Sequence, residues 1–113
     1  MTDPPAFSAQ AERRDGASLV TARGELDLAV ADELSAVLDS AQAPTLVLDL
    51  RDVTFIDSSG LSVIVAAHQR ARAAGARFAL VVTRPSPVHR LLELCGLAQT
   101  LTLIDDPDTL LVA

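Results

Sequence analysis

Cysteine, aromatic residues and lysine are nearly or wholly missing from this sequence. It has one cysteine, three phenylalanines, and no tryptophan, tyrosine or lysine among 113 residues. The lone Cys95 excludes an internal disulfide and fits a reducing compartment. No apolar run reaches the ~18 residues that a membrane-spanning helix needs, and residues 1–5 lack the basic and apolar regions of a signal peptide. We therefore expect a cytoplasmic protein.

Positive charge is also scarce. Nine arginines are set against 15 Asp and Glu residues, which gives a net charge of −6. A small acidic domain repels the phosphate backbone of nucleic acids and the headgroups of anionic lipids. We therefore expect no nucleic-acid partner and no membrane partner. The composition, 50% hydrophobic and 21% charged, is that of a folded chain, and the length suits one domain.

The N-terminal residues predict a hairpin. Residues 1–5 are expected to form a flexible tail. Apolar and polar residues alternate over residues 7–13, which predicts an edge strand. Asp15 and Gly16 suit the tight turn of a hairpin, so residues 19–23 are expected to return as a second strand.

A helix and a buried strand are predicted next. Residues 24–27 are expected to break the second strand, and Asp27 is placed to cap a helix over residues 28–40. The expected buried stripe of this helix consists of Leu28, Ala31, Leu34 and Leu38. The nearly all-apolar residues 45–50 predict a strand that is buried on both faces.

The next segment predicts a parallel crossover. Residues 51–57 are expected to connect the buried strand to a helix over residues 58–74, which Gly75 ends. Residues 77–83 predict another apolar strand. Because a strand–helix–strand crossover is right-handed, the two strands should be parallel, and the fold class is α/β.

The last third of the chain continues the alternation of strands and helices. Ser86 and Pro87 are expected to cap and start a third helix, which ends at Gly96. Residues 101–104 predict a last strand, and residues 106–108 could open a short terminal helix.

The segment Phe55-Ile56-Asp57-Ser58-Ser59-Gly60-Leu61 contains the strongest candidate site. It places two hydroxyls at the start of a predicted helix, where free backbone N–H groups and the helix dipole favour negative charge. One interpretation is an ordinary capped helix, with Asp or Ser as the cap and Gly60 allowing close packing. The other is a solvent-facing serine that can be phosphorylated, although Asp57 would lie beside the added charge. The residues alone leave both open.

Catalysis and metal binding have little support in the sequence. Ser58 is not in a Gly-x-Ser-x-Gly elbow, and no acid is placed to orient His89 as its base. His68, His89 and Cys95 are not at zinc-site spacing. Residues 105–108 lack the glycine and the distant glutamate of a calcium loop. We therefore expect no catalytic residue, no metal and no cofactor.

Three blocks of sequence occur in one order with short gaps. They are GELD at residues 24–27, LVLDLRDVTFIDSSGL at residues 46–61 and SPVHRLLELCGL at residues 86–97. Together they resemble the anti-sigma-factor antagonists, a family of single STAS domains. The resemblance covers residues 6–112. It implies a mixed, mostly parallel sheet of four or five strands with an N-terminal hairpin, packed against three to four helices.

The resemblance also implies a regulatory binding module rather than an enzyme. In that family the unmodified protein binds an anti-sigma factor, usually an ATP-using protein-serine kinase, and thereby frees a sigma factor. The kinase phosphorylates the serine directly after the aspartate of the motif, and a metal-dependent serine phosphatase reverses the reaction. On this sequence the acceptor is Ser58, with Ser59 as the alternative.

The same resemblance implies a partner-binding surface and a state of association. Its residues are Gly24, Glu25, Asp27, Asp57, Ser58, Ser59, Gly60 and Leu61. A monomer or weak dimer is expected. Two other roles stay open: a STAS subunit of a lipid-transport complex, which often lacks the serine motif, and a scaffold of a stress-sensing assembly, which usually has a separate N-terminal domain.

Overall fold

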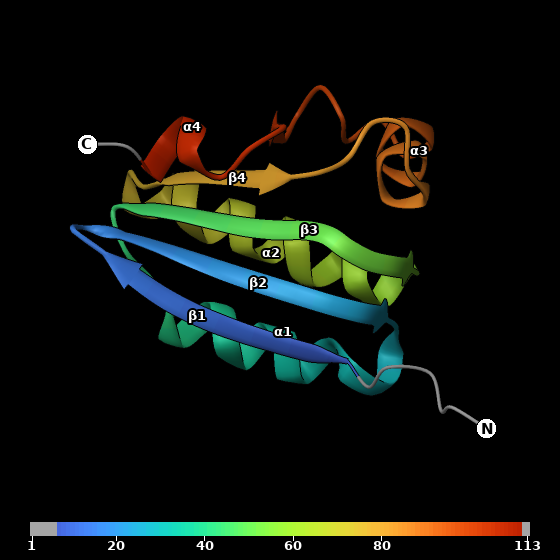
Figure 1. Cartoon of the computed structure of the whole chain (residues 1–113), viewed down its shortest axis with the longest axis horizontal. Coiled ribbons are helices and arrows are strands. Elements are labelled where there is room, and N and C mark those ends of the chain that lie inside the picture. Colours follow the sequence, from blue (N-terminus) through green and yellow to red (C-terminus); the bar gives the residue numbers. More distant parts are fainter. Residues whose placement is uncertain (1–6, 112–113) are drawn as a thin grey trace.

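The computed structural model of the chain describes residues 7–111. Its elements, in chain order, are β1 (Ser8–Arg14), β2 (Ala17–Leu26), α1 (Leu28–Ser40), β3 (Thr45–Ile56), α2 (Ser58–Ala74), β4 (Arg77–Val81), α3 (Pro87–Leu94), β5 (Thr102–Ile104) and α4 (Asp108–Leu111). The strands form one sheet in the order β1-β2-β3-β4-β5 (Figure 1). Strand β1 is antiparallel to β2, and the other neighbours are parallel. The predicted α/β fold, with its hairpin and crossover, is confirmed. The tail predicted for residues 1–5 and the two end residues of the predicted domain, 6 and 112, lie outside the described residues.

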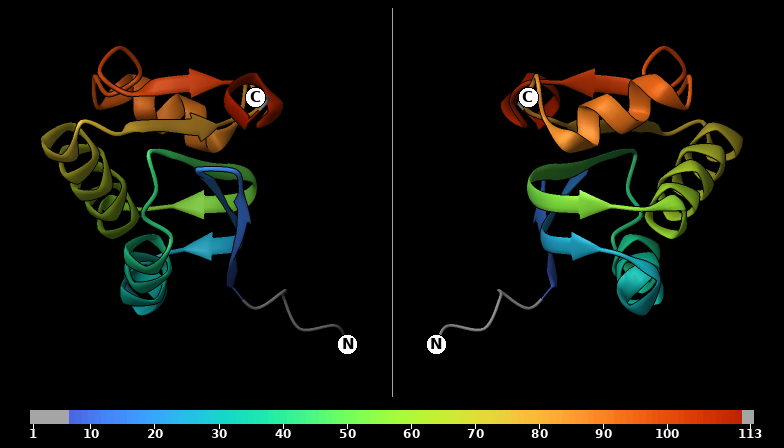
Figure 2. Two further views of the ribbon diagram at one scale, coloured as in Figure 1. Left: turned by 90° about the vertical axis from the view of Figure 1, so that its left-hand side faces the viewer. Right: turned by 90° about the vertical axis from the view of Figure 1, so that its right-hand side faces the viewer.

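Helices α1 and α2 lie side by side on one face of the sheet (Figures 1 and 2). The main core fills the space beneath them and includes Val20, Leu34, Leu48 and Ile64. On the opposite face, Leu19 and Val47 belong to a smaller cluster to which α4 contributes. Strand β3 therefore has buried residues on both faces, as its apolar sequence predicts.

Local capping signals set the helix ends as expected. The Asp27 side chain accepts a hydrogen bond from the N–H of Ala29 at the start of α1. Ser86 accepts one from the N–H of His89 at the start of α3. Gly75 ends α2 in the left-handed conformation, with φ of 69°, which is a conformation that favours glycine.

Strands β2 and β3 are longer than predicted. The expected break at residues 24–27 is wrong, because β2 continues to Leu26. The expected connection at residues 51–57 is also wrong, because β3 continues to Ile56. At two register shifts, β3 has one more residue than β2, and the pairing of the two strands resumes after each shift. These irregularities disturb the alternation of apolar and polar residues without ending the strands.

The predicted buried stripe of α1 is wrong at one position. Ala31, Leu34 and Leu38 are buried, whereas Leu28 is 76% exposed. Leu28 is the first residue of α1, and side chains on a helix lean toward its N-terminus. With no preceding helical turn to cover it, the Leu28 side chain remains in solvent.

Candidate functional site

The turn between β3 and α2 is organised by Asp57. Its Oδ1 atom accepts hydrogen bonds from the backbone N–H groups of Ser59, at 2.9 Å, and Gly60, at 3.2 Å. Asp57 is therefore the N-cap of α2, and Ser58 is the first helical residue. Since the carboxylate performs the capping, the two serine hydroxyls are not required for it.

The two serines of the turn differ in accessibility. Ser58 is exposed, whereas Ser59 is half-buried. The backbone carbonyl of Ser58 accepts a hydrogen bond from the hydroxyl of Ser62, one turn further along α2, at 2.9 Å. Ser58 is thus held at the helix start by its backbone, and its own hydroxyl group lies at the more accessible of the two positions.

Gly60 allows the first turn of α2 to lie directly against the strands. A Cβ atom at this position would lie 2.7 Å from Cγ of Leu26 and 2.9 Å from Cγ1 of Ile56. Both distances are shorter than any ordinary carbon contact. Gly60 therefore determines how closely the start of α2, and with it Ser58, approaches the ends of β2 and β3.

A second turn of the same design lies beside the first. Asp27 Oδ1 accepts from the N–H of Ala29 at 3.0 Å. The backbone angles of Asp27 (φ −118°, ψ −174°) nearly equal those of Asp57 (φ −116°, ψ −171°). The N–H of Asp57 donates to the carbonyl oxygen of Leu26 at 3.3 Å, which joins the two turns directly. Both turns lie at the end of the sheet that faces the viewer in the right panel of Figure 2.

The structure brings most of the predicted partner-binding residues together at this end. Glu25 is exposed, and Asp27 and Asp57 are half-buried. Within residues 7–111, these three carboxylates take part in none of the ion pairs. The surface around Ser58 is therefore acidic. The remaining predicted residues, Gly24, Gly60 and Leu61, are buried, so they shape this surface without offering side chains to a partner.

Two exposed apolar side chains near these turns were not among the expected site residues. Leu28 follows Asp27, and Phe55, which is 47% exposed, precedes Asp57 by two residues. The sequence predicted Leu28 to lie in the buried stripe of a helix and placed Phe55 in a connection between a strand and a helix. Leu26 and Ile56, the apolar residues directly before the two capping aspartates, are buried, so the sequence held no signal that distinguished the exposed apolar residues from the buried ones.

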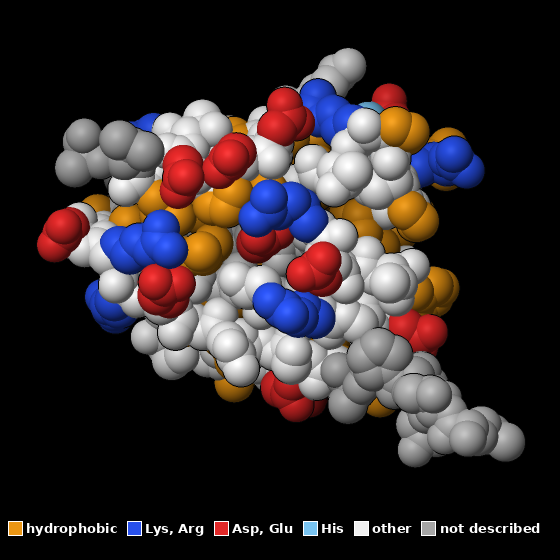
Figure 3. Space-filling model, in the orientation of Figure 1, with side chains coloured by type: hydrophobic (Ala, Val, Ile, Leu, Met, Phe, Trp, Pro, Cys, Tyr) orange, Lys and Arg blue, Asp and Glu red, His pale blue; other side chains and the backbone are white. Residues whose placement is uncertain are grey.

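Charged residues of both signs cover the sheet face opposite α1 and α2 (Figure 3). The best-formed pair there joins Arg51 Nη2 to Asp49 Oδ2 at 2.8 Å, and the Asp49 side chain is only 9% exposed. The hydrogen bond to Asp49 raises the pKa of the Arg51 guanidinium. This pairing satisfies a buried carboxylate and has a structural role.

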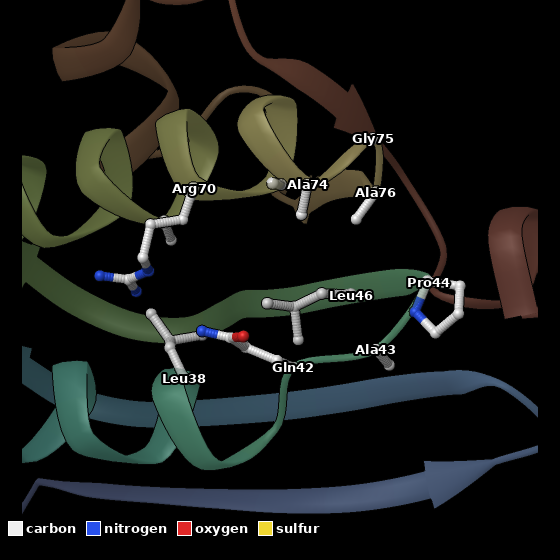
Figure 4. A pocket seen from close by; sticks show the side chains of 11 residues that line it. Leu38, Gln42, Ala43, Pro44, Leu46, Arg70, Ala74, Gly75 and Ala76 are labelled. Carbon is white, nitrogen blue, oxygen red and sulfur yellow. The ribbon is translucent and has the colours of Figure 1, made fainter.

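The clearest cavity lies away from the serines. It has a volume of about 370 Å³ and lies between the C-terminal parts of α1 and α2, where Leu38, Leu46, Ala74 and Arg70 line it (Figure 4). Within residues 7–111, no group of His, Cys, Asp or Glu side chains is arranged to hold a metal ion. None of the helices in that range is long and apolar enough to cross a membrane.

The STAS domain family model matches residues 8–110. This chain belongs to the STAS domain family. An anti-sigma F factor antagonist from Paenibacillus polymyxa is 34% identical to this STAS domain in an alignment 99 residues long that covers 84% of each chain. The crystal structure of an anti-sigma factor antagonist from Mycobacterium paratuberculosis superposes with a TM-score of 0.85 and 28% identity, over 96% of this chain and 94% of the other.

A more distant structure shares the fold. SpoIIAA, a Bacillus cell fate determinant solved in its phosphorylated form, superposes with a TM-score of 0.68 and 23% identity, over 92% of this chain and 94% of the other. The relatives named as anti-sigma factor antagonists confirm the resemblance found in the sequence blocks. The single STAS domain and its mixed sheet agree with the predicted fold.

Proposed function

We propose that this STAS domain is an anti-sigma factor antagonist that is switched by phosphorylation of Ser58. The unmodified protein binds an anti-sigma factor that is also an ATP-using protein-serine kinase, and this binding releases a sigma factor for transcription. A metal-dependent serine phosphatase removes the phosphate and restores binding. The protein acts in the cytoplasm as a regulator rather than as an enzyme. The names of its relatives support the general role.

The observation that carries the proposal is that Asp57 caps α2, so the exposed hydroxyl of Ser58 is not needed for capping. Asp57 satisfies the N–H groups of Ser59 and Gly60, so Ser58 can be modified without loss of the cap. In the reaction, Ser58 Oγ takes the γ-phosphoryl group of ATP, ADP leaves, and the hydroxyl proton passes to a base of the kinase. Ser59 is the alternative acceptor, but it is less exposed.

The phosphate is expected to act on the interface rather than on the fold. At the start of α2, the helix dipole favours it by about 0.3–1 kcal/mol. Repulsion from the half-buried Asp57 beside the exposed Ser58 is of similar size, so the two effects nearly cancel. Against a partner surface, a group with almost two charges must lose its water, which costs several kcal/mol unless an arginine receives it. A cost of about 3 kcal/mol weakens binding more than a hundredfold.

The test is phosphorylation with purified components. Each serine-kinase anti-sigma factor of the organism that encodes this chain is incubated with ATP and the wild-type protein, and the modified residue is identified by mass spectrometry. We expect one kinase to bind the protein and to modify Ser58, and the phosphate to be absent from Ser58→Ala. Phosphate that persists in Ser58→Ala but disappears in Ser59→Ala would move the acceptor to Ser59. If no kinase binds or modifies the wild-type protein, the proposed function is wrong.

A further inference from the structure

Three large apolar side chains in the described part of the chain are strongly exposed. They are Leu28, at 76%, Phe55, at 47%, and Leu94, at 77%. A single exposed leucine on a protein surface is ordinary. Two of these three, however, flank the paired turns that carry Ser58, Leu28 as the first residue of α1 and Phe55 near the end of β3. Leu94 is the last residue of α3, which lies at the same end of the molecule (Figure 1).

Leu28 and Ser58 occupy equivalent positions on neighbouring helices. Each is the first helical residue after a capping aspartate of nearly identical backbone geometry. Helices α1 and α2 run in the same direction and pack against one another (Figure 2). Because packed helices lie about 8–10 Å apart, the Leu28 side chain projects from the same end of the molecule as Ser58, roughly one helix diameter away.

Phe55 lies on the other side of Ser58. Successive residues of a strand point to opposite faces of the sheet. Ile56 is buried and faces Gly60 of α2, so Phe55 faces away from α2. In the sheet, Phe55 pairs in register with the exposed Glu25 of β2. The serine is therefore flanked by an exposed leucine on the helix side and an exposed phenylalanine on the opposite side.

We propose that Leu28 and Phe55 are the apolar anchors through which the kinase partner binds this end of the STAS domain. The inference rests on the proposed function. A kinase that reaches the Ser58 hydroxyl covers the surface around it, and a standard interface of about 800 Å² per partner has a radius of roughly 16 Å. Phe55 is only three residues from Ser58, and Leu28 is about one helix spacing away, so both fall within that radius and the kinase would bury them.

The charged residues near Leu28 and Phe55 indicate what kind of partner surface would fit them. Glu25 pairs with Phe55 in the sheet, Asp27 directly precedes Leu28, and Asp57 follows Phe55 by two residues. None of these three carboxylates has an ion-pair partner within residues 7–111. A complementary partner surface has apolar recesses for a leucine and an aromatic ring, edged by arginine or lysine side chains. A phosphate on Ser58 would bring its hydration shell between the two anchors, which explains why modification at this position would separate the proteins.

The test compares Leu28→Ala and Phe55→Ala with Leu94→Ala, which removes an equally exposed leucine from α3. The probe is the purified anti-sigma kinase that phosphorylates the wild-type protein. We expect the first two variants to bind it at least ~10-fold more weakly and to raise KM for phosphorylation with kcat little changed. Leu94→Ala should bind within about twofold of the wild type. Melting curves establish that each variant is folded, and Leu28→Ala alone suffices if Phe55→Ala does not fold.

The outcomes separate this inference from the proposed function. If the wild-type protein is phosphorylated but Leu28→Ala and Phe55→Ala bind as it does, the anchors are wrong and the phosphorylation switch stands. If Leu94→Ala weakens binding as much as the other two, the assignment to these two residues is also wrong. If no anti-sigma kinase acts on the wild-type protein, the proposed function itself fails.

Discussion

Gly60 lies so close to Leu26 that a Cβ atom at residue 60 would be 2.7 Å from the leucine Cγ and 3.0 Å from its carbonyl oxygen. The start of α2 therefore lies against the end of β2, a strand that is distant from it in the sequence. Ser58 owes its position to this contact as well as to β3, which precedes it.

Replacement of Gly60 by alanine tests this contact. An alanine within a helix usually adds up to about 1 kcal/mol of stability, but here the methyl group must displace backbone and side-chain atoms, at a cost of about 1–3 kcal/mol. We expect a net loss, measured by urea unfolding. Gln69→Ala, on the exposed face of the same helix, is the control and should change stability by less than about 0.5 kcal/mol. A more stable Gly60→Ala protein would show that the contact relaxes freely.

The cap of α2 should depend on the shape of the Asp57 side chain more than on its charge. Asp57→Ala leaves the N–H groups of Ser59 and Gly60 without their acceptor, and we expect it to lose about 1 kcal/mol of unfolding free energy. Asp57→Asn keeps an acceptor oxygen and should stay within about 0.5 kcal/mol of the wild type. Equal losses in the two variants would contradict capping as the role of this residue.

Substitutions at Ser58 should separate binding from stability. Ser58→Ala is expected to bind the anti-sigma factor and to resist inactivation by ATP, with a melting temperature close to that of the wild type because Asp57 provides the cap. Ser58→Asp is expected to bind at least ~10-fold more weakly, because a charge is placed in the interface. Calorimetric titration measures both affinities. A large melting shift in either variant would indicate that the switch acts through the fold.

The capping signals were the part of the site that could be predicted. Asp27, Asp57 and Ser86 are short polar residues directly before helical patterns, and hydrogen bonds to nearby N–H groups define their role. The full lengths of β2 and β3 could not be predicted, since their pairing continues across two register shifts that depend on distant residues. The exposure of Leu28 escaped prediction for a related reason, because helical periodicity does not reveal where the sheet beneath a helix ends.

The pair formed by Asp49 and Arg51 should stabilise the fold through the buried carboxylate. Arg51→Met removes every side-chain donor to Asp49. The backbone N–H of residue 51 still donates to Oδ1, but Oδ2 is left without a donor, which costs about 1–3 kcal/mol. The raised pKa of Arg51 means that its contribution is present below the ordinary arginine pKa and is lost only as pH rises through the higher folded value. The difference in stability between wild type and variant should therefore be constant between about pH 6 and 9, which urea unfolding at several pH values can check.

The carboxylates of Glu25, Asp27 and Asp57 should increase the association rate with a partner that has a basic surface. We expect the association rate to fall as salt increases, because screening shortens the range of the attraction. Glu25→Gln should lower the rate about twofold at low salt and flatten its salt dependence, as measured by stopped-flow mixing. An unchanged rate and an unchanged slope would limit Glu25 to a structural role.

The cavity between α1 and α2 lies at the end of α2 that is opposite to Ser58. A helix of 17 residues is about 25 Å long, and the cavity is lined only by its second half, from Ala67 onward, so the cavity and the serine are at different ends of α2. Larger side chains at Ala71 or Ala74 could raise thermal stability while the partner-binding end stays as it is. Thermal stability and the surface around Ser58 can therefore be altered independently in this domain.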